Sequence, residues 1–250
     1  MDRDRLRSLS NVGCVYTTGN GTPEKEEFMD IIISAAKAEL ESARSVPPGN
    51  RLKTGDIRKI SAKIYKNVKG KPVDDVLSVC GELLEQRNRP MGIMAYDFAY
   101  RVRKQYNDKT FAVFESWLEN YVRGWGDCDD FCIHAFGELI CQNTKLAENV
   151  IAWTKKEGFW MRRAAAVVLI PSIWHNQYKE THPLRVSDIL MADGHYLVLK
   201  GYGWMLKVLS TKEPELVMEY LLKNKAVMPR VAYRYALEKM DAAVKRVLMQ

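Results

Sequence analysis

The segment Trp160-Met-Arg-Arg163-Ala-Ala165 has two degenerate copies further along the chain. The first copy, Leu197-Val-Leu-Lys200-Gly-Tyr202, begins 37 residues later, and the second, Val231-Ala-Tyr-Arg234-Tyr-Ala236, begins 34 residues after that. Each copy places a basic residue beside small residues within an apolar helical pattern, and small residues let neighbouring helices approach closely. A period of this length is typical of paired-helix repeats that stack into a solenoid.

The rest of the chain carries the period of an amphipathic α-helix. In residues 26–44, apolar side chains recur at steps of three and four, namely Phe28, Ile31, Ile32, Ala35, Ala36 and Leu40. The same period predicts further helices over 54–67, 73–87, 90–106, 110–121, 127–142, 145–155, 158–170, 183–191, 195–209, 213–223 and 229–248. No segment alternates with a two-residue period between turns, so we expect no sheet.

These patterns predict an all-α fold, a HEAT- or armadillo-like helical-repeat solenoid with a concave face. We expect one such domain over residues 24–250, preceded by an N-terminal arm over residues 1–23, whose glycines and threonines are typical of a loop or a mobile arm. An ordinary helical bundle is the alternative fold. It gives no reason for a basic residue in each period.

The composition is that of a folded protein with a basic surplus. Of the 250 residues, 47% are hydrophobic and 28% are charged, and the formal net charge is +7. This charge favours an anionic partner, most commonly nucleic acid. No apolar run reaches the roughly 18 residues that a membrane span needs. The first nine residues lack the apolar core of a signal peptide, so we expect a cytoplasmic protein without a membrane partner.

The five cysteines are odd in number and lie within apolar helical patterns: Cys14, Cys80, Cys128, Cys132 and Cys141. Cys128 and Cys132 share a helix face, but no second pair with metal-ligand spacing exists. We therefore expect reduced core cysteines and no metal site.

The segment Arg123-Gly-Trp125-Gly-Asp127-Cys-Asp129-Asp130 is the strongest candidate for chemistry. Asp127 directly precedes an apolar helix, so it is predicted to be the N-cap, with Asp130 completing a pair like a capping box. Asp129 is not needed for that cap, which makes it the candidate functional carboxylate. A solvated acidic first turn is the alternative.

Two of the six tryptophans stand apart from the core pattern. Trp125 lies between two glycines, and Trp204 follows Gly203, with Gly201 nearby. Glycine inside a helix costs roughly 1 kcal/mol relative to alanine, so something is expected to approach the backbone there. A ligand surface lined by two indoles is one interpretation, and close packing of helices is the other.

Basic residues recur over many of the predicted repeats. Arg162 and Arg163 lie inside an apolar run, where an arginine is either a solvated flank or a bidentate phosphate clamp. Further candidates for contact with a long duplex backbone are Lys53, Arg58, Lys200 and Lys207.

Taken together, these motifs resemble the HEAT-repeat alkylpurine DNA glycosylases of the DNA alkylation repair (AlkD-like) family. The resemblance covers the chain from about Glu24, and the order and spacing of four segments carry it. The four segments are Lys53-Thr-Gly-Asp56-Ile-Arg58-Lys59, Trp125 to Asp129, Phe159-Trp-Met-Arg-Arg-Ala-Ala165 and Lys200-Gly-Tyr-Gly203-Trp204-Met-Leu206.

The resemblance implies hydrolysis of the N-glycosidic bond of cationic alkylated purines, of the 3-methyladenine and 7-methylguanine type, in base excision repair. By position it implies Asp129 as the catalytic carboxylate, Trp125 and Trp204 as the indoles that hold the lesion nucleotide, and Arg163 as the arginine beside them. The implied enzyme is a monomer that needs no cofactor, and its partner is double-stranded DNA containing alkylated bases. Two alternatives stay open: a relative that binds DNA structure without catalysis, and a HEAT-like protein scaffold.

Overall fold

The computed structural model describes residues 23–45 and 52–249, and within these ranges every regular element is helical. In chain order the α-helices are α1 (Pro23–Ser45), α2 (Thr54–Tyr65), α3 (Val73–Glu85), α4 (Arg89–Arg101), α5 (Thr110–Asn120), α6 (Trp125–Phe131), α7 (Gly137–Gln142), α8 (Ala147–Trp153), α9 (Phe159–Val167), α10 (Ile170–Trp174), α11 (Pro183–Leu190), α12 (Tyr196–Leu209), α13 (Pro214–Asn224), α14 (Arg230–Leu237) and α15 (Ala242–Met249). Short 3₁₀ turns are Arg103–Gln105, Thr144–Leu146 and Lys179–Thr181, and a π-helical turn, Cys132–Phe136, joins α6 to α7.

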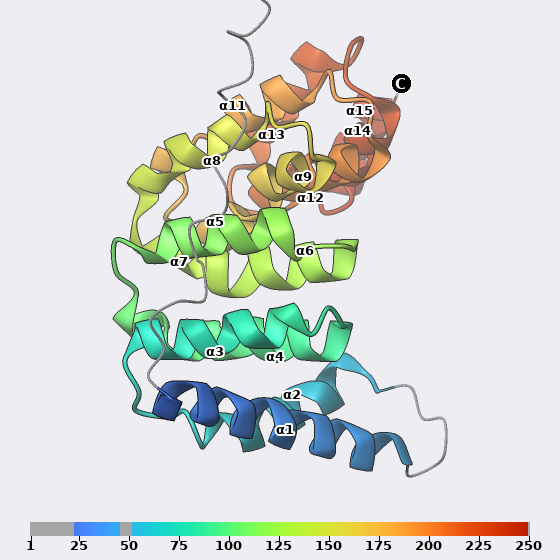
Figure 1. The fold of residues 1–250 in the computed structure, drawn as a ribbon. Coiled ribbons are helices and arrows are strands. Elements are labelled where there is room, and N and C mark those ends of the chain that lie inside the picture. Colours follow the sequence, from blue (N-terminus) through green and yellow to red (C-terminus); the bar gives the residue numbers. More distant parts are fainter. Residues whose placement is uncertain (1–22, 46–51, 250) are drawn as a thin grey trace, which may run out of the picture.

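The helices pair and stack from α1 and α2 at one end to α14 and α15 at the other (Figure 1). One row runs through the whole stack, because α2, α4, α6, α9, α12 and α14 contact one another in that order. We call this row layer B. The second row includes α1, α3, α8 and α11, and each packs against a helix of layer B: α1 against α2, α3 against α4, α8 against α9 and α11 against α12. The predicted all-α helical-repeat fold is therefore confirmed.

The three copies of the sequence repeat lie on α9, α12 and α14, which are successive helices of layer B. Small residues at the contacts of these helices allow close approach, as the repeat predicts. A Cβ atom at Gly203 would lie 2.9 Å from the carbonyl oxygen of Ala232, so the backbones of α12 and α14 meet at a distance that only glycine permits. Helix packing therefore accounts for this glycine without a ligand.

A continuous core of aliphatic and aromatic side chains fills the space between the rows. Its centre is a group of fully buried rings that touch edge to face or at a tilt: Phe114, Phe131, Phe136 and Trp153. Burying one such side chain stabilises the fold by about 1.5–3 kcal/mol. Phe131 also stacks on Tyr96 of α4 at 4.5 Å between centroids, which anchors α6 in layer B.

Several boundaries differ from the predicted ones. The segment predicted as one helix over 229–248 forms α14 and α15, because the side chain of Asp241 accepts a hydrogen bond from the backbone N–H of Ala243 at 2.7 Å and starts a new helix. The helix predicted over 158–170 ends at Val167, and Pro171 lies in the first turn of the short α10. The helix predicted over 127–142 is interrupted by the π-helical turn.

Four cysteines are free and buried, as predicted for core residues: Cys80, Cys128, Cys132 and Cys141. Cys14 and all of the predicted arm except Pro23 belong to residues 1–22, which lie outside the described residues. Pro23, predicted to close the arm, is the first residue of α1. None of the described helices is both long and apolar enough to cross a membrane.

Candidate functional site

Asp129 and Arg163 form a bidentate ion pair between α6 and α9. The Nε of Arg163 donates to Oδ1 of Asp129 at 2.9 Å, and one terminal nitrogen donates to Oδ2 at 2.8 Å. The Arg163 side chain is 6% exposed and the Asp129 side chain 16% exposed. The arginine is therefore withdrawn from solvent, while part of the Asp129 side chain stays accessible. Two nitrogens of the guanidinium therefore bind both oxygens of the carboxylate, which fixes the orientation of the carboxylate.

The seat of Arg163 is built by α12. The remaining terminal nitrogen of Arg163 donates to the carbonyl oxygen of Leu197 in the first turn of α12. A Cβ atom at Gly201 would lie 3.2 Å from Cγ of Arg163, so this glycine leaves room for the arginine stem. Burial acts to lower the pKa of Arg163, but the hydrogen bonds and charge of Asp129 outweigh it, and the pKa is raised. The guanidinium therefore stays charged.

Trp125 stands one helical turn before Asp129. It is the first residue of α6, and 64% of its surface is exposed. Residues four apart on a helix lie on the same face, so the indole and the Asp129 carboxylate are neighbours on the surface of α6. The expectation that Trp125 lacks a core partner is met, although it lies in a helix rather than in a loop.

The cap of α6 differs from the prediction. The N-cap is Gly124, and Asp127 is the third residue of the helix. Burial raises the pKa of the Asp127 carboxyl, opposed by a hydrogen bond from the Arg123 backbone. Asp130 takes no part in the cap, because it pairs with Arg58 on α2 and with His134. Asp127 as the N-cap and Asp130 as its partner were therefore wrong, because the helix begins two residues earlier than its apolar pattern does.

Trp204 lies on α12, one turn after Gly201, and it is partly buried against the core. Because α9 contacts both α6 and α12, the three helices bring Asp129, Arg163 and Gly201 into one continuous cluster. Trp204 is three residues after Gly201, so the two lie near the same face of α12. Of the other tryptophans, Trp117 and Trp153 are core residues, whereas Trp174 is 43% exposed, contrary to its predicted packing role.

Most of the basic residues predicted to bind DNA have partners within the protein. Arg162 donates to Asp193 at 2.5 Å and to the carbonyl oxygens of Lys156 and Glu157. Lys207 pairs with Glu238 at 2.6 Å. These contacts tie loops and helices of adjacent repeats together. The prediction that these side chains grip phosphate gains no support from their geometry, and the same holds for the buried Arg163.

Lys53 and Lys200 are differently placed. Lys53 is exposed at the start of α2. The Nζ atom of Lys200 lies over the rings of Tyr196 and Tyr235, at 4.6 and 5.3 Å from their centroids, without a carboxylate partner among the described residues. A cation between two rings keeps its charge and stays near the surface of α12.

A second network around Asp130 was not predicted from the sequence. Arg58 on α2 reaches across α4 to pair with the Asp130 carboxylate, and its NH1 lies 3.5 Å from Nε2 of His134. The Nδ1 atom of His134 lies 2.8 Å from the carbonyl oxygen of Asp130. Asp130 and His134 are four residues apart, a spacing that predicts contact between two side chains on one helix face. Arg58 is 72 residues away in the chain, so nothing in the sequence linked it to them.

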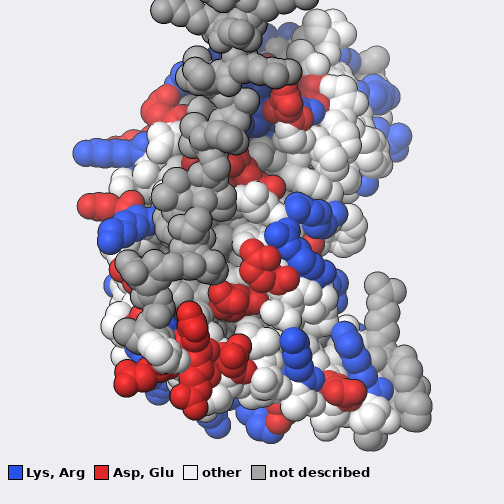
Figure 2. All heavy atoms as spheres, viewed as in Figure 1, with Lys and Arg blue, Asp and Glu red and all other residues white. Residues whose placement is uncertain are grey.

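Charges of both signs are interspersed on the uncovered part of the face seen in Figure 2. That part of the surface therefore carries no continuous basic stripe. Within the described ranges, no group of three or more histidine, cysteine or acidic side chains is arranged to hold a metal ion.

Comparison with known proteins places the chain. The sequence model of the DNA alkylation repair enzyme family matches residues 51–240, so the chain belongs to this family. A solved structure described as a predicted DNA alkylation repair enzyme from Enterococcus faecalis superposes with a TM-score of 0.63 at 17% sequence identity. The alignment covers 89% of this chain and 98% of the other, and at this identity it supports the fold alone. No curated protein sequence matches the chain.

Proposed function

We propose that the protein is a DNA glycosylase that hydrolyses the N-glycosidic bond of cationic alkylated purines in duplex DNA. The observation that carries the proposal is the Asp129 carboxylate, which Arg163 holds in a bidentate pair while the side chain stays partly exposed, one helical turn from the exposed Trp125. Membership in the DNA alkylation repair enzyme family supports the reaction class.

The chemistry needs little more than a placed negative charge. A purine alkylated on a ring nitrogen carries a positive charge, so the bond from C1′ to the base nitrogen breaks with its electron pair returning to the ring, and a neutral base leaves. Positive charge then develops on the deoxyribose. Asp129 stabilises that charge electrostatically, and it orients a water molecule and accepts its proton as the new C1′–O bond forms.

Arg163 is a positioning residue in this scheme. Its guanidinium fixes both carboxylate oxygens of Asp129 and is itself fixed by Leu197, so the carboxylate does not reorient as charge develops. Such preorganisation is the main way that a protein lowers the barrier of a charge-separating step.

The two indoles suit a cationic nucleotide. The face of an indole attracts a cation by about 0.5–2 kcal/mol. Trp125 presents its ring to solvent one turn from Asp129, and Trp204 occupies the adjoining part of α12. We assign both to holding the lesion nucleotide, with discrimination arising mainly from the charge and lability of the lesion.

Duplex DNA is the proposed partner of layer B, bound by the protein as a monomer. Lys53 and Lys200 are the predicted basic residues that have no carboxylate partner among the described residues, so we assign direct phosphate contacts to them first. Arg58, Arg162 and Lys207 belong to internal ion pairs and contribute through the shape and potential of the surface.

The proposal is tested by incubating the full chain with methylated duplex DNA and measuring release of free base. We expect release of methylated purines together with abasic sites in the DNA. Binding without release would replace the enzyme by a non-catalytic DNA-binding protein. Binding that does not fall with salt, or no binding, would favour a protein scaffold, because log affinity for DNA falls by roughly 0.9 per log salt for each phosphate neutralised.

A further inference from the structure

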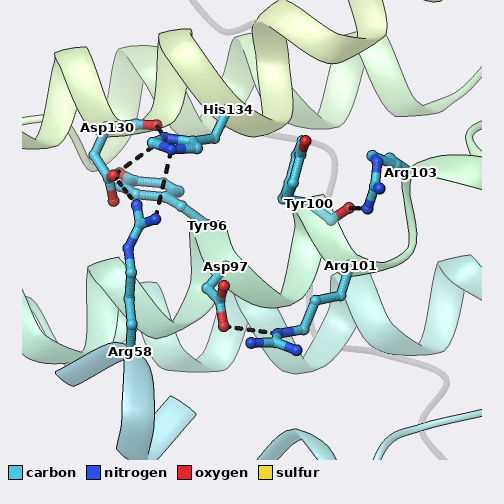
Figure 3. A pocket seen from close by; sticks show the side chains of 8 residues that line it. All are labelled: Arg58, Tyr96, Asp97, Tyr100, Arg101, Arg103, Asp130 and His134. Atoms are coloured by element: carbon cyan, nitrogen blue, oxygen red, sulfur yellow. Dashed lines mark hydrogen bonds and ion pairs between the residues drawn. The ribbon is translucent and has the colours of Figure 1, made fainter. Parts of the chain in front are cut away.

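A pocket of about 270 Å³ opens among α2, α4, the turn that follows α4, and the junction of α6 with the π-helical turn. Its lining includes Arg58, Tyr100, Arg101, Arg103, Asp130 and His134. Figure 3 shows Arg58, Asp130 and His134 together, with Arg103 on the other side of Tyr100. Three positive charges that line one pocket favour the binding of an anion there. Two carboxylates, Asp97 and Asp130, neutralise only part of that charge.

The two arginines beside Tyr100 have unused donors. Arg101 donates through Nε to Asp97 at 2.8 Å, and Arg103 donates through NH1 to the carbonyl oxygen of Tyr100 at 3.2 Å. Within the described residues, neither guanidinium makes another hydrogen bond to the protein. Each has several N–H groups and a planar fork, which is the geometry that phosphate oxygens accept.

The inner part of the pocket holds polar atoms that lack partners. The Nε of Arg58 and the Oδ2 of Asp130 are buried and have no hydrogen-bond partner among the described atoms. Leaving a buried donor and acceptor unpaired costs about 1–3 kcal/mol each. Both atoms lie out of reach of water, so they mark the Arg58–Asp130 pair as incompletely satisfied and are not themselves contacts for a ligand.

We propose that this pocket binds one phosphate group of the DNA backbone. The inference rests on the proposed function and adds to it a fixed point of contact. Asp129 and Asp130 are adjacent on α6, but Asp129 pairs toward α9 and Asp130 toward α2. A phosphate held by Arg101 and Arg103 therefore lies on the α2 side of the same helix and sets the register of the duplex relative to Asp129.

Asp97 and Asp130 do not oppose this assignment. The Asp97 carboxylate is occupied by Arg101 and by the hydroxyl of Ser61 at 2.5 Å. The Oδ1 of Asp130 is occupied by Arg58 and His134, and its Oδ2 is buried away from solvent. Each carboxylate fixes one arginine, while Arg103 has no carboxylate partner among the described residues and lies over the ring of Tyr100 at 4.4 Å from its centroid. Arg103 is therefore the residue whose removal reports most cleanly on an anion in the pocket.

The first arm of the test measures affinity for unmodified duplex DNA against salt concentration, for the wild type, Arg103→Gln and the control Arg185→Gln. Arg185 lies on α11 and pairs with Glu148 at the surface. We expect Arg103→Gln to flatten the slope of log affinity against log salt by about 0.9, and Arg185→Gln to leave it unchanged. An unchanged slope for Arg103→Gln would overturn the proposal, whether or not the protein excises bases.

The second arm uses inorganic phosphate as the probe and the imidazole NMR signals of the full chain. We expect a saturable shift of the His134 signal, assigned through His134→Gln, that is lost in Arg103→Gln and absent from the exposed His175. No saturable shift would contradict an anion site. A shift with an unchanged DNA salt slope would assign the pocket to free phosphate and overturn the DNA assignment.

Discussion

Arg163 illustrates how one contact changes the role that a residue type suggests. Its position within an apolar run favoured either a solvated flank or a phosphate clamp, and in the fold it is 5% exposed and paired with Asp129. A buried arginine paired with a carboxylate mainly orients that carboxylate. Removing either partner leaves the other charge buried and unpaired. The sequence predicted that Asp129 and Arg163 lie near one another only through the family resemblance, since they are 34 residues apart.

Gly201 carries the sharpest prediction at the residue scale. Gly201→Ala places a methyl group 3.2 Å from Cγ of Arg163, so the arginine must shift by a few tenths of an ångström or leave its rotamer. An off-rotamer side chain costs about 0.5–1.5 kcal/mol, which corresponds to a roughly 2- to 10-fold loss of excision rate. Gly81→Ala on α3, where a Cβ meets nothing within 4 Å, is the control and leaves the rate unchanged. Equal rates for all three proteins in a single-turnover assay would show that the seat of Arg163 does not matter.

At the scale of elements, the start of α6 shows what a helical period predicts and what it omits. The apolar residues Cys128, Phe131, Cys132 and Ala135 are buried as the period requires. The helix nevertheless begins earlier, at Trp125, because Gly124 adopts the extended conformation of a cap. Trp125 is exposed, so the period of buried residues does not mark this start. The π-helical turn had no signal in the period at all, since it depends on contacts with α4, α9 and α10.

The raised pKa of Asp127 gives a prediction for α6 as an element. A carboxyl whose pKa is raised by folding favours the folded state most at low pH, and this stabilisation is lost as pH rises through the folded pKa. Asp127→Asn removes the cost of the buried charge while an amide oxygen still accepts the backbone bond. We expect a higher Tm for Asp127→Asn at pH 7, by about 1–2 °C, in thermal unfolding. The difference should close as the pH falls below the ordinary value of 3.8, and a wild type that is the more stable at pH 7 would reverse the assignment.

For the whole molecule, the repeat in the sequence was enough to predict the all-α stacked architecture. The predicted period places α9, α12 and α14 side by side, and the small residues lie at their contacts. Pairings between distant repeats were beyond the sequence, because the Arg58–Asp130 pair spans 72 residues and depends on how α2 and α6 flank α4. Each ion pair of this kind removes one positive and one negative charge, so the net charge of +7 is unchanged by pairing. The pairs decide instead which of the cations are free to meet DNA.

The difference between free and paired cations predicts different effects for two substitutions, Lys200→Gln and Arg162→Gln. Lys200→Gln removes a cation that has only aromatic neighbours in the described structure, so it should flatten the salt dependence of duplex binding by about 0.9 in slope. Arg162→Gln removes a cation held by Asp193 and two carbonyl oxygens. It should lower the Tm by several degrees, through about 1–3 kcal/mol of lost charged hydrogen bonds, and leave the slope unchanged. The opposite pattern would reverse which of the two residues contacts phosphate.

The central claim is that Asp129 stabilises the charge that develops on the sugar, and single-turnover excision of a methylated purine from duplex DNA tests it most directly. The comparison is among wild type, Asp129→Asn and Asp127→Asn, a matched change of another carboxylate on the same turn of α6. We expect Asp129→Asn to lose at least about 100-fold in rate with DNA affinity retained, and Asp127→Asn to excise at the wild-type rate. Full excision by Asp129→Asn would contradict the account.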